Sequence, residues 1–476
     1  MQQRENLTGN ALASDSVGTW ELVFQGLGQI TPITILAGLI ISIVSFSLQV
    51  APLVMVISFL AVFMAANTIY QFSGIVAHAG GYYAYVEYGM GPLMGKFTGL
   101  QYLLYQTANL GLELLLVMWG FSKSLNYAFG TSLPIWTGIV WIGSMVVLSY
   151  IMMVKGVRPS LKLALILGGI QVAFVIILSL IIIPLAPDNT VSTFVPSVAT
   201  GGWTGVFLGF IVGGYLAFAG YGSIVPMGEE ARAPRKTIGK AIIVVIIMAG
   251  AVFILGSYAM VVGYGIPSIQ TFAQQVIPGL IVTRRFVGIA GAVTFILINT
   301  FLSTYGTVVG MGTPLSRVFF ALSRDGLVST KLSKVNNHGT PVTAINVTYI
   351  VTILVAVTMG SIFYLKYGFY TGIYYAWVIF GTIATLSTLL IHILSNTSLS
   401  VTKATKLRNK HILTWLIIPT ITTILMAVAY YYSLLGITMP FLVAPIIFLG
   451  WIIISIIIIF IRRTKLKSIV FDEETV

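Results

Sequence analysis

One carboxyl group stands at a depth where it could do chemistry across a membrane. Glu113 lies in the stretch Asn109-Leu-Gly-Leu-Glu113-Leu-Leu-Leu, and it is the only acidic residue well inside any long apolar run of the 476-residue chain. A charge there costs about 2.5–3.5 kcal/mol, so such residues are functional candidates by default. Glu113 can take up and release a proton during transport or pair with a cationic substrate. The alternative is a structural hydrogen bond to a neighbouring helix.

Two apolar stretches contain residues that interrupt a helix. Pro32 has no N–H to donate and clashes with the preceding helical turn. The segment Phe218-Ala-Gly-Tyr-Gly-Ser223 brings poor helix formers into the run that begins at Trp203. Backbone groups freed within hydrocarbon must face protein or a cavity, and matching breaks in two halves of a chain indicate a transporter site. Each break alone can also be a simple kink or a glycine packing surface.

The chemistry of two such breaks suits a small zwitterion. N–H groups at a helix start attract a carboxylate, and freed carbonyl groups accept hydrogen bonds from an ammonium group. Nearby side chains would then select the rest of the substrate. The residues expected to bind it are Ile30, Thr31, Pro32, Ile33, Thr34, Phe218, Ala219, Gly220, Tyr221, Gly222, Asn109 and Tyr105.

Composition assigns the chain to the polytopic membrane proteins. It is 57% hydrophobic and only 8% charged, whereas soluble domains carry about 25% charged residues. The chain has no cysteine, its four histidines are scattered, and no paired carboxylates or filter-like loop occur. We therefore predict no enzyme, channel, catalytic residue or cofactor, and no firm metal site.

Apolar runs predict twelve membrane spans. With the N-terminus in the cytoplasm, 21 of the 25 Lys and Arg residues fall on the inner side, as the positive-inside rule requires. The net charge of +13 therefore reflects topology, and no nucleic-acid partner is expected. The predicted spans are 19–45, 50–72, 93–125, 134–153, 160–184, 203–227, 236–264, 282–311, 342–362, 369–394, 412–435 and 439–461.

Three segments resemble the amino acid–polyamine–organocation (APC) permeases. Phe218–Gly222, Glu229-Glu230 and Pro234–Ala241 resemble helix six and the loop after it. Two more matches are Gly80-Gly-Tyr-Tyr-Ala-Tyr85 and the segment from Ser316-Arg317 to Arg324-Asp-Gly326. The resemblance covers roughly residues 20–400. It implies a leucine-transporter-type fold: an all-α polytopic membrane protein with 12 transmembrane helices, in a 5+5 inverted repeat with discontinuous helices 1 and 6, plus two C-terminal helices.

The expected organisation follows from this resemblance. Residues 1–18 and 462–476 are cytoplasmic tails, 19–184 and 203–394 are the two five-helix repeats, and 412–461 hold the last two helices. Around residues 78–92 we expect a short interfacial helix with its tyrosines at headgroup level. Glu229 and Glu230 should mark the return of the chain to water, and Arg324 and Asp325 should be interfacial and structural.

The coupling ion is left open by the sequence. Gln171 stands near the position where some APC permeases carry a lysine that replaces a sodium ion, which puts a lysine-based proton mechanism in doubt. Ser303 and Thr304 lie roughly where sodium-coupled relatives place hydroxyl ligands, although such hydroxyls can also bond to their own helix. The coupling candidates are Glu113, Gln171, Ser303 and Thr304.

The predicted function is secondary active transport of amino acids, or related small organocations, across the cell membrane by alternating access. Proton-coupled symport is the first expectation. The alternatives are an uncoupled or obligate amino acid/polyamine exchanger and a sodium-coupled symporter. Expected partners are the small-molecule substrate, membrane lipid and a proton or sodium co-ion.

Overall fold

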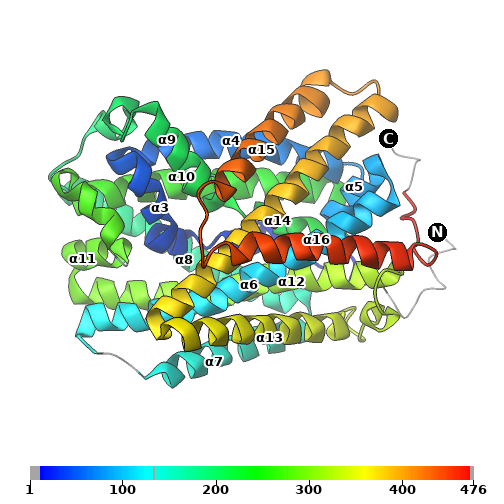
Figure 1. The fold of residues 1–476 in the computed structure, drawn as a ribbon, viewed down its shortest axis with the longest axis horizontal. Helices are drawn as coiled ribbons and strands as arrows, with labels where there is room; N and C mark the ends of the chain where they lie inside the picture. The colour runs from blue at the N-terminus through cyan, green and yellow to red at the C-terminus, as the bar shows by residue number, and fades with distance from the viewer. Residues whose placement is uncertain (1–10, 132–133, 276, 472–476) are drawn as a thin grey trace.

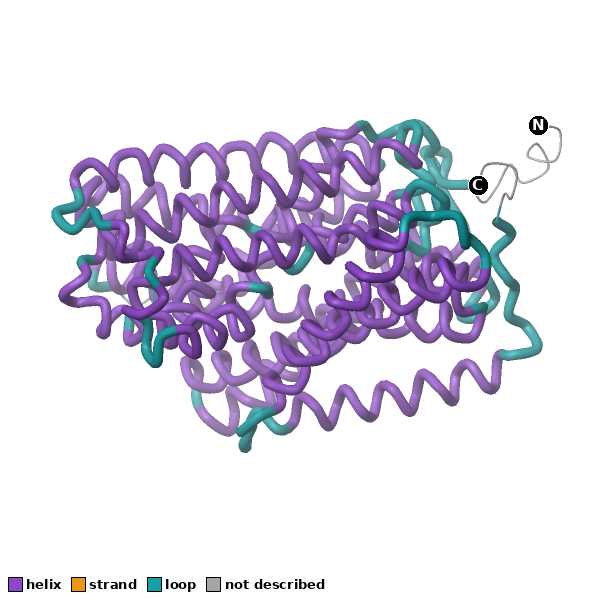
Figure 2. Tube along the Cα trace, turned by 90° about the horizontal axis from the view of Figure 1, so that it is seen from above, coloured by secondary structure: helices purple, strands orange, loops and turns teal. Residues whose placement is uncertain are grey.

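The computed structural model describes residues 11–131, 134–275 and 277–471, which form one bundle of helices. Both ends of the described chain lie at the same end of the bundle, on the right of Figure 1. Figure 2 shows that most loops gather at the two ends of the helices. Among the described residues the β-type pairing is a single bridge between Val17 and Ala231. Residues 1–10 and 472–476 of the predicted tails lie outside the described part.

The first half of the chain contains eight α-helices and begins with an interrupted span. Their bounds are α1 (Thr19–Ile30), α2 (Pro32–Thr34), α3 (Ile40–Ser47), α4 (Ala51–Ser73), α5 (Tyr82–Met90), α6 (Pro92–Phe129), α7 (Ile135–Lys155) and α8 (Val157–Leu185). A π-helical turn, η2 (Ile35–Leu39), joins α2 to α3.

The second half begins with a span that is α-helical over only seven residues, α9 (Trp203–Gly209). A π-turn η6 (Phe210–Gly214) and two 3-10 segments, η7 (Leu216–Phe218) and η8 (Tyr221–Met227), complete it. The helices that follow are α10 (Pro234–Tyr264), α11 (Pro278–Leu297), α12 (Ser303–Arg324), α13 (Val342–Tyr367), α14 (Phe369–Thr405), α15 (Ile418–Leu434) and α16 (Val443–Arg462). The 3-10 segment η9 (Ile266–Gln274) follows α10, and the π-turns η10 (Ile298–Leu302) and η12 (Leu413–Ile417) precede α12 and α15.

Ten stretches of the described chain are long and apolar enough to cross a membrane, compared with the twelve predicted. The difference lies in the first half. The stretch Leu36–Ser73 joins part of the first predicted span to the second, and α6 is not among the ten. α6 buries polar side chains against the rest of the bundle, including Lys96, Gln101, Gln106 and Glu113, because it packs along α14, α12 and α5. The count of twelve therefore stays a prediction.

Helix α1 lies at the centre of the packing. It contacts α8, α10, α12 and η8, and every residue from Gln25 to Ile30 is buried. Close approach is possible because a Cβ added at Gly28 would lie 3.0 Å from the carbonyl oxygen of Gly306 in α12. An interruption at the end of α1 therefore faces protein and not lipid, as freed backbone groups require.

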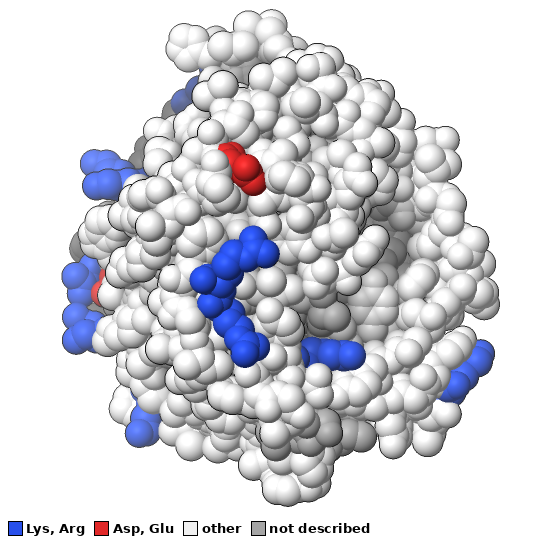
Figure 3. Space-filling view, turned by 90° about the vertical axis from the view of Figure 1, so that its left-hand side faces the viewer, with Lys and Arg blue, Asp and Glu red and all other residues white. Residues whose placement is uncertain are grey.

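Charged side chains are unevenly distributed between the two ends of the bundle. The end opposite the termini is mostly uncharged, as its face shows in Figure 3. At the end that holds the termini, the loops carry most of the Lys and Arg residues.

Candidate functional site

The first span is interrupted at a single residue. α1 ends at Ile30, and Thr31 adopts a left-handed conformation with φ of 46°. That conformation costs roughly 1–2 kcal/mol for a residue with a side chain. Pro32 then opens α2, where its missing N–H does no harm because the first turn has no intrahelical acceptor for it.

The sixth span is interrupted over a longer segment, and two glycines bring it close to its neighbours. Gly220 has φ of 116°, which L side chains rarely adopt, and a Cβ there would lie 2.7 Å from Cγ of Gln29 in α1. A Cβ at Gly222 would lie 1.7 Å from the hydroxyl oxygen of Tyr82 in α5. Glycine is thus required where η8 packs against α1 and α5.

A small cavity lies beside this segment. Its volume is about 10 Å³, enough for roughly one water molecule. The described part of its wall combines aromatic rings, two glycines and the aliphatic hydroxyl groups of Ser223 and Thr388, with no acidic residue, Lys or Arg. The lining residues are Tyr82, Tyr102, Tyr105, Gly220, Gly222, Ser223, Thr388, Ile391 and His392.

Two lining side chains have features of a binding site. The Ser223 hydroxyl is buried and has no hydrogen-bond partner among the described residues, a situation that costs free energy unless a ligand or water completes it. The His392 ring is stacked on Tyr221, with centroids 5.6 Å apart, and stands edge-on to Tyr82 at 5.2 Å.

A chain of amide and hydroxyl groups connects the cavity wall to α1. Gln29 Nε2 donates to the Tyr105 hydroxyl at 3.1 Å and to Gln106 Oε1 at 3.2 Å. Gln106 Nε2 donates in turn to the Tyr102 hydroxyl at 2.9 Å. These bonds hold α6 against the interrupted end of α1.

The predicted binding residues divide into two groups. Tyr105, Gly220 and Gly222 line the cavity, and Tyr221 stacks on its His392. The others that the structure describes do not line it, namely Ile30, Thr31, Pro32, Ile33, Asn109, Phe218 and Ala219. The side chain of Thr34 lies outside the described part of the chain. The Phe218 ring packs on Phe253 of α10, with centroids 5.0 Å apart. Sequence reasoning missed Tyr82, Tyr102, Ser223, Thr388, Ile391 and His392.

The four coupling candidates come from three helices. Thr307 Oγ1 donates to Glu113 Oε1 at 3.4 Å and to the Ser303 carbonyl at 2.7 Å. The Ser303 hydroxyl donates to Gln171 Oε1 at 3.2 Å, and Gln171 Nε2 is buried with no partner in the described chain. A polar path thus runs from α6 through α12 to α8. The fourth candidate, Thr304 of α12, donates to the Thr300 carbonyl of the preceding π-turn η10 and stands apart from the path.

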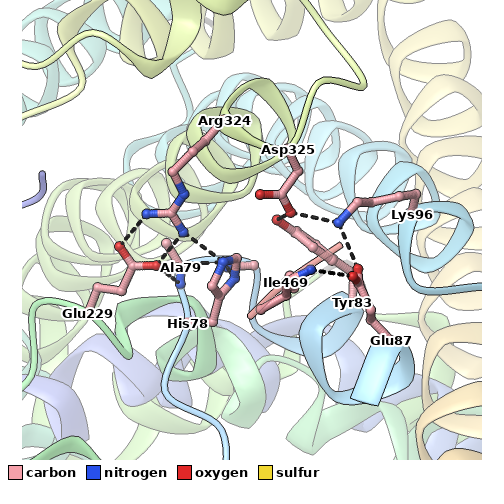
Figure 4. A network of polar contacts seen from close by, with 10 residues as sticks. His78, Ala79, Tyr83, Glu87, Lys96, Glu229, Arg324, Asp325 and Ile469 are labelled. Atoms are coloured by element: carbon pink, nitrogen blue, oxygen red, sulfur yellow. Dashed lines mark hydrogen bonds and ion pairs between the residues drawn. The ribbon is translucent and has the colours of Figure 1, made fainter. Parts of the chain in front are cut away.

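Buried ion pairs fill the end of the bundle where the termini lie (Figure 4). Lys96 Nζ lies 2.7 Å from Glu87 Oε2 and 2.6 Å from Asp325 Oδ2, and the Tyr83 hydroxyl donates to Asp325 at 2.9 Å. The backbone N–H of Ile469 donates to Glu87 at 2.7 Å. We call these five residues the Lys96 cluster.

A second group lies beside it. The Arg324 guanidinium donates two hydrogen bonds to the Glu229 carboxylate, at 2.6 and 2.9 Å, and the Ala79 N–H donates to the same carboxylate. Burial alone would raise the pKa of Glu229, but these hydrogen bonds and the charges of His78 and Arg324 lower it to about 2. Burial lowers the pKa of His78 to about 4. Its Nδ1 accepts from the Gly80 N–H at 2.9 Å, and its Nε2 lies 2.7 Å from the Arg324 guanidinium. Protonation would remove the acceptor lone pair of Nδ1 and place a positive charge beside Arg324.

Two expectations about this end were wrong. The predicted short helix exists as α5, but Tyr82, Tyr83, Tyr85 and Tyr88 are buried in protein instead of lying at headgroup level, because α5 packs between α6 and α14.

One of the charged residues also differs from expectation. Glu230 is fully buried, and Arg317 donates two hydrogen bonds of 2.9 Å to its carboxylate. Glu230 therefore does not mark the return of the chain to water. Asp325 is buried in the Lys96 cluster, where it pairs with Lys96 at 2.6 Å, and Arg324, one third exposed, pairs with Glu229 at 2.6 Å. Both therefore have structural contacts, as expected, and their interfacial position stays a prediction.

Comparison with known proteins gives one family and several relatives. The model of the family described as amino acid permease matches residues 21–468. A branched-chain amino acid permease, BcaP, of Lactococcus lactis is 28% identical over 51% of this chain and 52% of its own length. BcaP of Bacillus subtilis is 24% identical over 71% of this chain and 73% of its own length. An uncharacterized transporter of Mycobacterium tuberculosis is 28% identical over 32% of this chain and 31% of its own length. The first of these matches spans about half of the relative.

Proposed function

We propose, because this chain belongs to the amino acid permease family, that its cavity binds a zwitterionic amino acid with an apolar side chain. The observation that carries the proposal is a polar cavity beside the interrupted sixth span, with no Asp, Glu, Lys or Arg in the described part of its wall. The interrupted end of α1 packs on the same span, where Gln29 lies against Gly220. Backbone dipoles and hydroxyl groups can hold both charged ends of a zwitterion. The rings and Ile391 would then contact its apolar part.

Branched-chain amino acids are the first substrates to test. Two relatives carry that substrate in their names. A cavity of about 10 Å³ is too small for any amino acid, so the wall must move to admit one. We propose that the first, second, sixth and seventh predicted spans rock against the others to open it to each side in turn.

The membrane arrangement is part of the same proposal. We place the protein in the cell membrane with twelve spans, two inverted five-helix repeats at 19–184 and 203–394, and two added helices at 412–461. The tails, 1–18 and 462–476, lie in the cytoplasm. The excess of Lys and Arg in the loops at the end that holds the termini supports this orientation.

We further propose that transport is coupled to protons through Glu113. Its carboxylate is buried 3.4 Å from the Thr307 hydroxyl, with no cation paired to it in the described chain. Protonation would remove the free-energy cost of that buried charge. The polar path through Ser303 to Gln171 links the protonation state of Glu113 to α12 and α8.

Reconstituted protein separates this mechanism from its alternatives. We expect a proton gradient to drive leucine accumulation in proteoliposomes, and counterflow to proceed without a gradient. Glu113→Gln should abolish accumulation and keep counterflow, while Glu21→Gln, a half-exposed carboxylate in α1, should retain both. Accumulation driven only by sodium, or exchange alone in the native protein, would establish one of the alternative mechanisms. Absence of leucine counterflow would contradict the substrate class.

A further inference from the structure

A second hollow, much larger than the cavity, opens between helices at the end of the bundle that holds the termini. Its volume is about 580 Å³. Figure 1 draws α4, α10 and α15 beside one another, and α4 packs against both of the others. The lining residues are Tyr70, Gln71, Gly74, Ile75, Arg235, Lys236, Gly239, Lys240, Ile243, Val244, Lys410 and Trp415.

Positive charge dominates this hollow. Arg235, Lys236 and Lys240 reach it from the first turns of α10, and Lys410 reaches it from the segment before η12. No acidic residue lines it, and the three lysines are exposed and form no ion pair with the described residues. Lysines from two distant parts of the chain therefore converge on one space that has no carboxylate among its described lining residues. The positive-inside rule accounts for the side of the membrane but not for this convergence.

The rest of the wall is suited to lipid. Ile75, Ile243 and Val244 give it an apolar part, and Tyr70 and Trp415 supply the aromatic rings typical of a membrane interface. Ile243 and Val244 follow Lys240 by one turn of α10, so the apolar part lies on the mid-membrane side of the cations. A molecule with a negative head and apolar tails matches this order of charge and apolar surface.

We propose that the hollow binds the headgroup of an anionic phospholipid of the inner leaflet. Basic pockets between membrane helices on the cytoplasmic side are suited to such headgroups. The lysines would contact the phosphate, and the acyl chains would lie along Ile243 and Val244. The proposal relies on the orientation given above, but lipid binding in detergent can be measured without any transport.

Binding would connect two parts of the molecule. Lys236 and Lys240 belong to α10, whereas Lys410 precedes α15, so one phosphate would bridge them. A ligand that binds only the folded protein raises its melting temperature. Anionic lipid should therefore stabilise the purified protein, and uncharged lipid should not.

Native mass spectrometry and thermal shift in detergent test the proposal. We expect phosphatidylglycerol to bind and raise Tm, phosphatidylcholine to do neither, and inorganic phosphate at the same concentration to have no effect. The triple variant Lys236→Gln/Lys240→Gln/Lys410→Gln should weaken phosphatidylglycerol binding roughly 100-fold, since each lysine near a membrane surface contributes about 1 kcal/mol.

A matched variant excludes a general effect of charge. Lys155→Gln/Lys331→Gln/Lys334→Gln removes three exposed lysines at the same end but outside the hollow, and it should bind phosphatidylglycerol like the native protein. Equal weakening in both variants would overturn the proposal, as would a Tm rise with inorganic phosphate alone. Leucine counterflow, measured separately, reports the proposed function, so failure of either claim can be recognised on its own.

Discussion

The Ser223 hydroxyl is the clearest single contact available to a substrate. It is 2% exposed, lines the cavity and has no hydrogen-bond partner among the described residues. A buried hydroxyl without a partner gains more free energy from a hydrogen bond to a charged ligand group than a hydroxyl that is already hydrogen-bonded. Because Ser223 lies in η8, between Gly222 and Ile224, the irregular backbone of η8 determines how its side chain is oriented.

We predict that Ser223→Ala weakens leucine binding about 10-fold or more, because a hydrogen bond to a charged group is worth about 1.5–3 kcal/mol. Its Tm should hardly change, since no bond within the protein is lost. Ser179→Ala is the control: that hydroxyl is equally buried but donates to the Val175 carbonyl at 2.7 Å, so Tm should fall and binding should not. Isothermal titration and thermal shift measure both quantities. Unchanged affinity in Ser223→Ala would remove Ser223 from the site.

At the scale of single residues, the sequence indicated candidates where one residue is chemically unusual in its surroundings. Glu113 and Gly220 stand out in apolar runs; Glu113 is buried and Gly220 lines the cavity, and their roles stay predictions. His392 carries the same signal, since it is an ionisable residue in the apolar run Leu389-Leu-Ile-His392-Ile-Leu, but it was passed over because the four histidines are scattered in the sequence. Thr388 could not be found in this way, because α14 holds many Ser and Thr residues and nothing in their spacing separates those that line the cavity from those that contact other helices.

At the scale of elements, the site depends on how closely η8 approaches its neighbours. Pro32 and the glycines of 218–223 predicted where regular winding stops, and the structure interrupts both spans there. The sequence did not indicate that α5 would reach the cavity. From the sequence, the tyrosines of α5 were predicted to form an interfacial belt. Packing against α6 and α14 buries them instead, and Tyr82 lines the cavity.

Substitution of Gly222 tests whether η8 must lie this close to α5. An added Cβ would lie 1.7 Å from the Tyr82 hydroxyl, and the ring cannot turn away because it packs on Tyr85, Tyr102 and His392. We predict that Gly222→Ala costs about 1–3 kcal/mol of overpacking and reduces leucine counterflow at least about 10-fold.

The control for Gly222→Ala is a helical glycine in open space. Gly120 of α6 has no atom within 4 Å of an added Cβ, so Gly120→Ala should keep counterflow and gain up to about 1 kcal/mol from helix propensity. Thermal shift and counterflow report both variants. Normal transport by Gly222→Ala would contradict the role given to the α5–η8 contact.

At the scale of the whole molecule, the end that holds the termini is closed by groups from distant parts of the chain. The loop before α5, the loop after η8 and the end of α12 supply His78, Glu229 and Arg324 (Figure 4). Sequence reasoning placed these charges on one side of the membrane, but their pairing depends on the fold and could not be predicted.

This arrangement predicts a pH dependence of stability. The pKa of His78 is about 4 in the fold and 6.5 ordinarily. As pH falls through 6.5 the unfolded chain binds a proton that the folded chain excludes, so the free energy of unfolding falls, by about 2 kcal/mol at pH 5. Above pH 6.5 the ring is neutral in both states and contributes no slope. Glu229, with its pKa of about 2, adds a loss only below about pH 4.5.

Thermal shift between pH 7.5 and 5 measures the effect. We expect Tm of the native protein to drop across this range and the drop to shrink in His78→Gln. His338→Gln, at an exposed position, should behave like the native protein. An identical drop in all three would show that His78 does not control the slope.

The C-terminal segment closes the same end from outside. The Ile469 N–H donates to Glu87, the Lys467 N–H donates to the Asp325 carbonyl at 3.0 Å, and the Phe471 ring stands edge-on to Tyr88 at 5.0 Å. Residues 466–471 thus hold α5 against the end of α12. Removing them leaves the ion pairs of Lys96 in place but takes a donor from the buried Glu87, at a cost of about 1–3 kcal/mol.

We predict that truncation after Lys465 increases deuterium exchange in α5 and at the end of α12, and not in α7 or α8, because local opening is set by the contacts that hold each element. Truncation after Phe471 keeps all three contacts and should exchange like the full chain. Counterflow should persist in both, since the three contacts named above involve no residue that lines the cavity. If α5 exchanges equally in the two truncations, the Lys96 cluster alone holds this end, and the segment has no part in closing it.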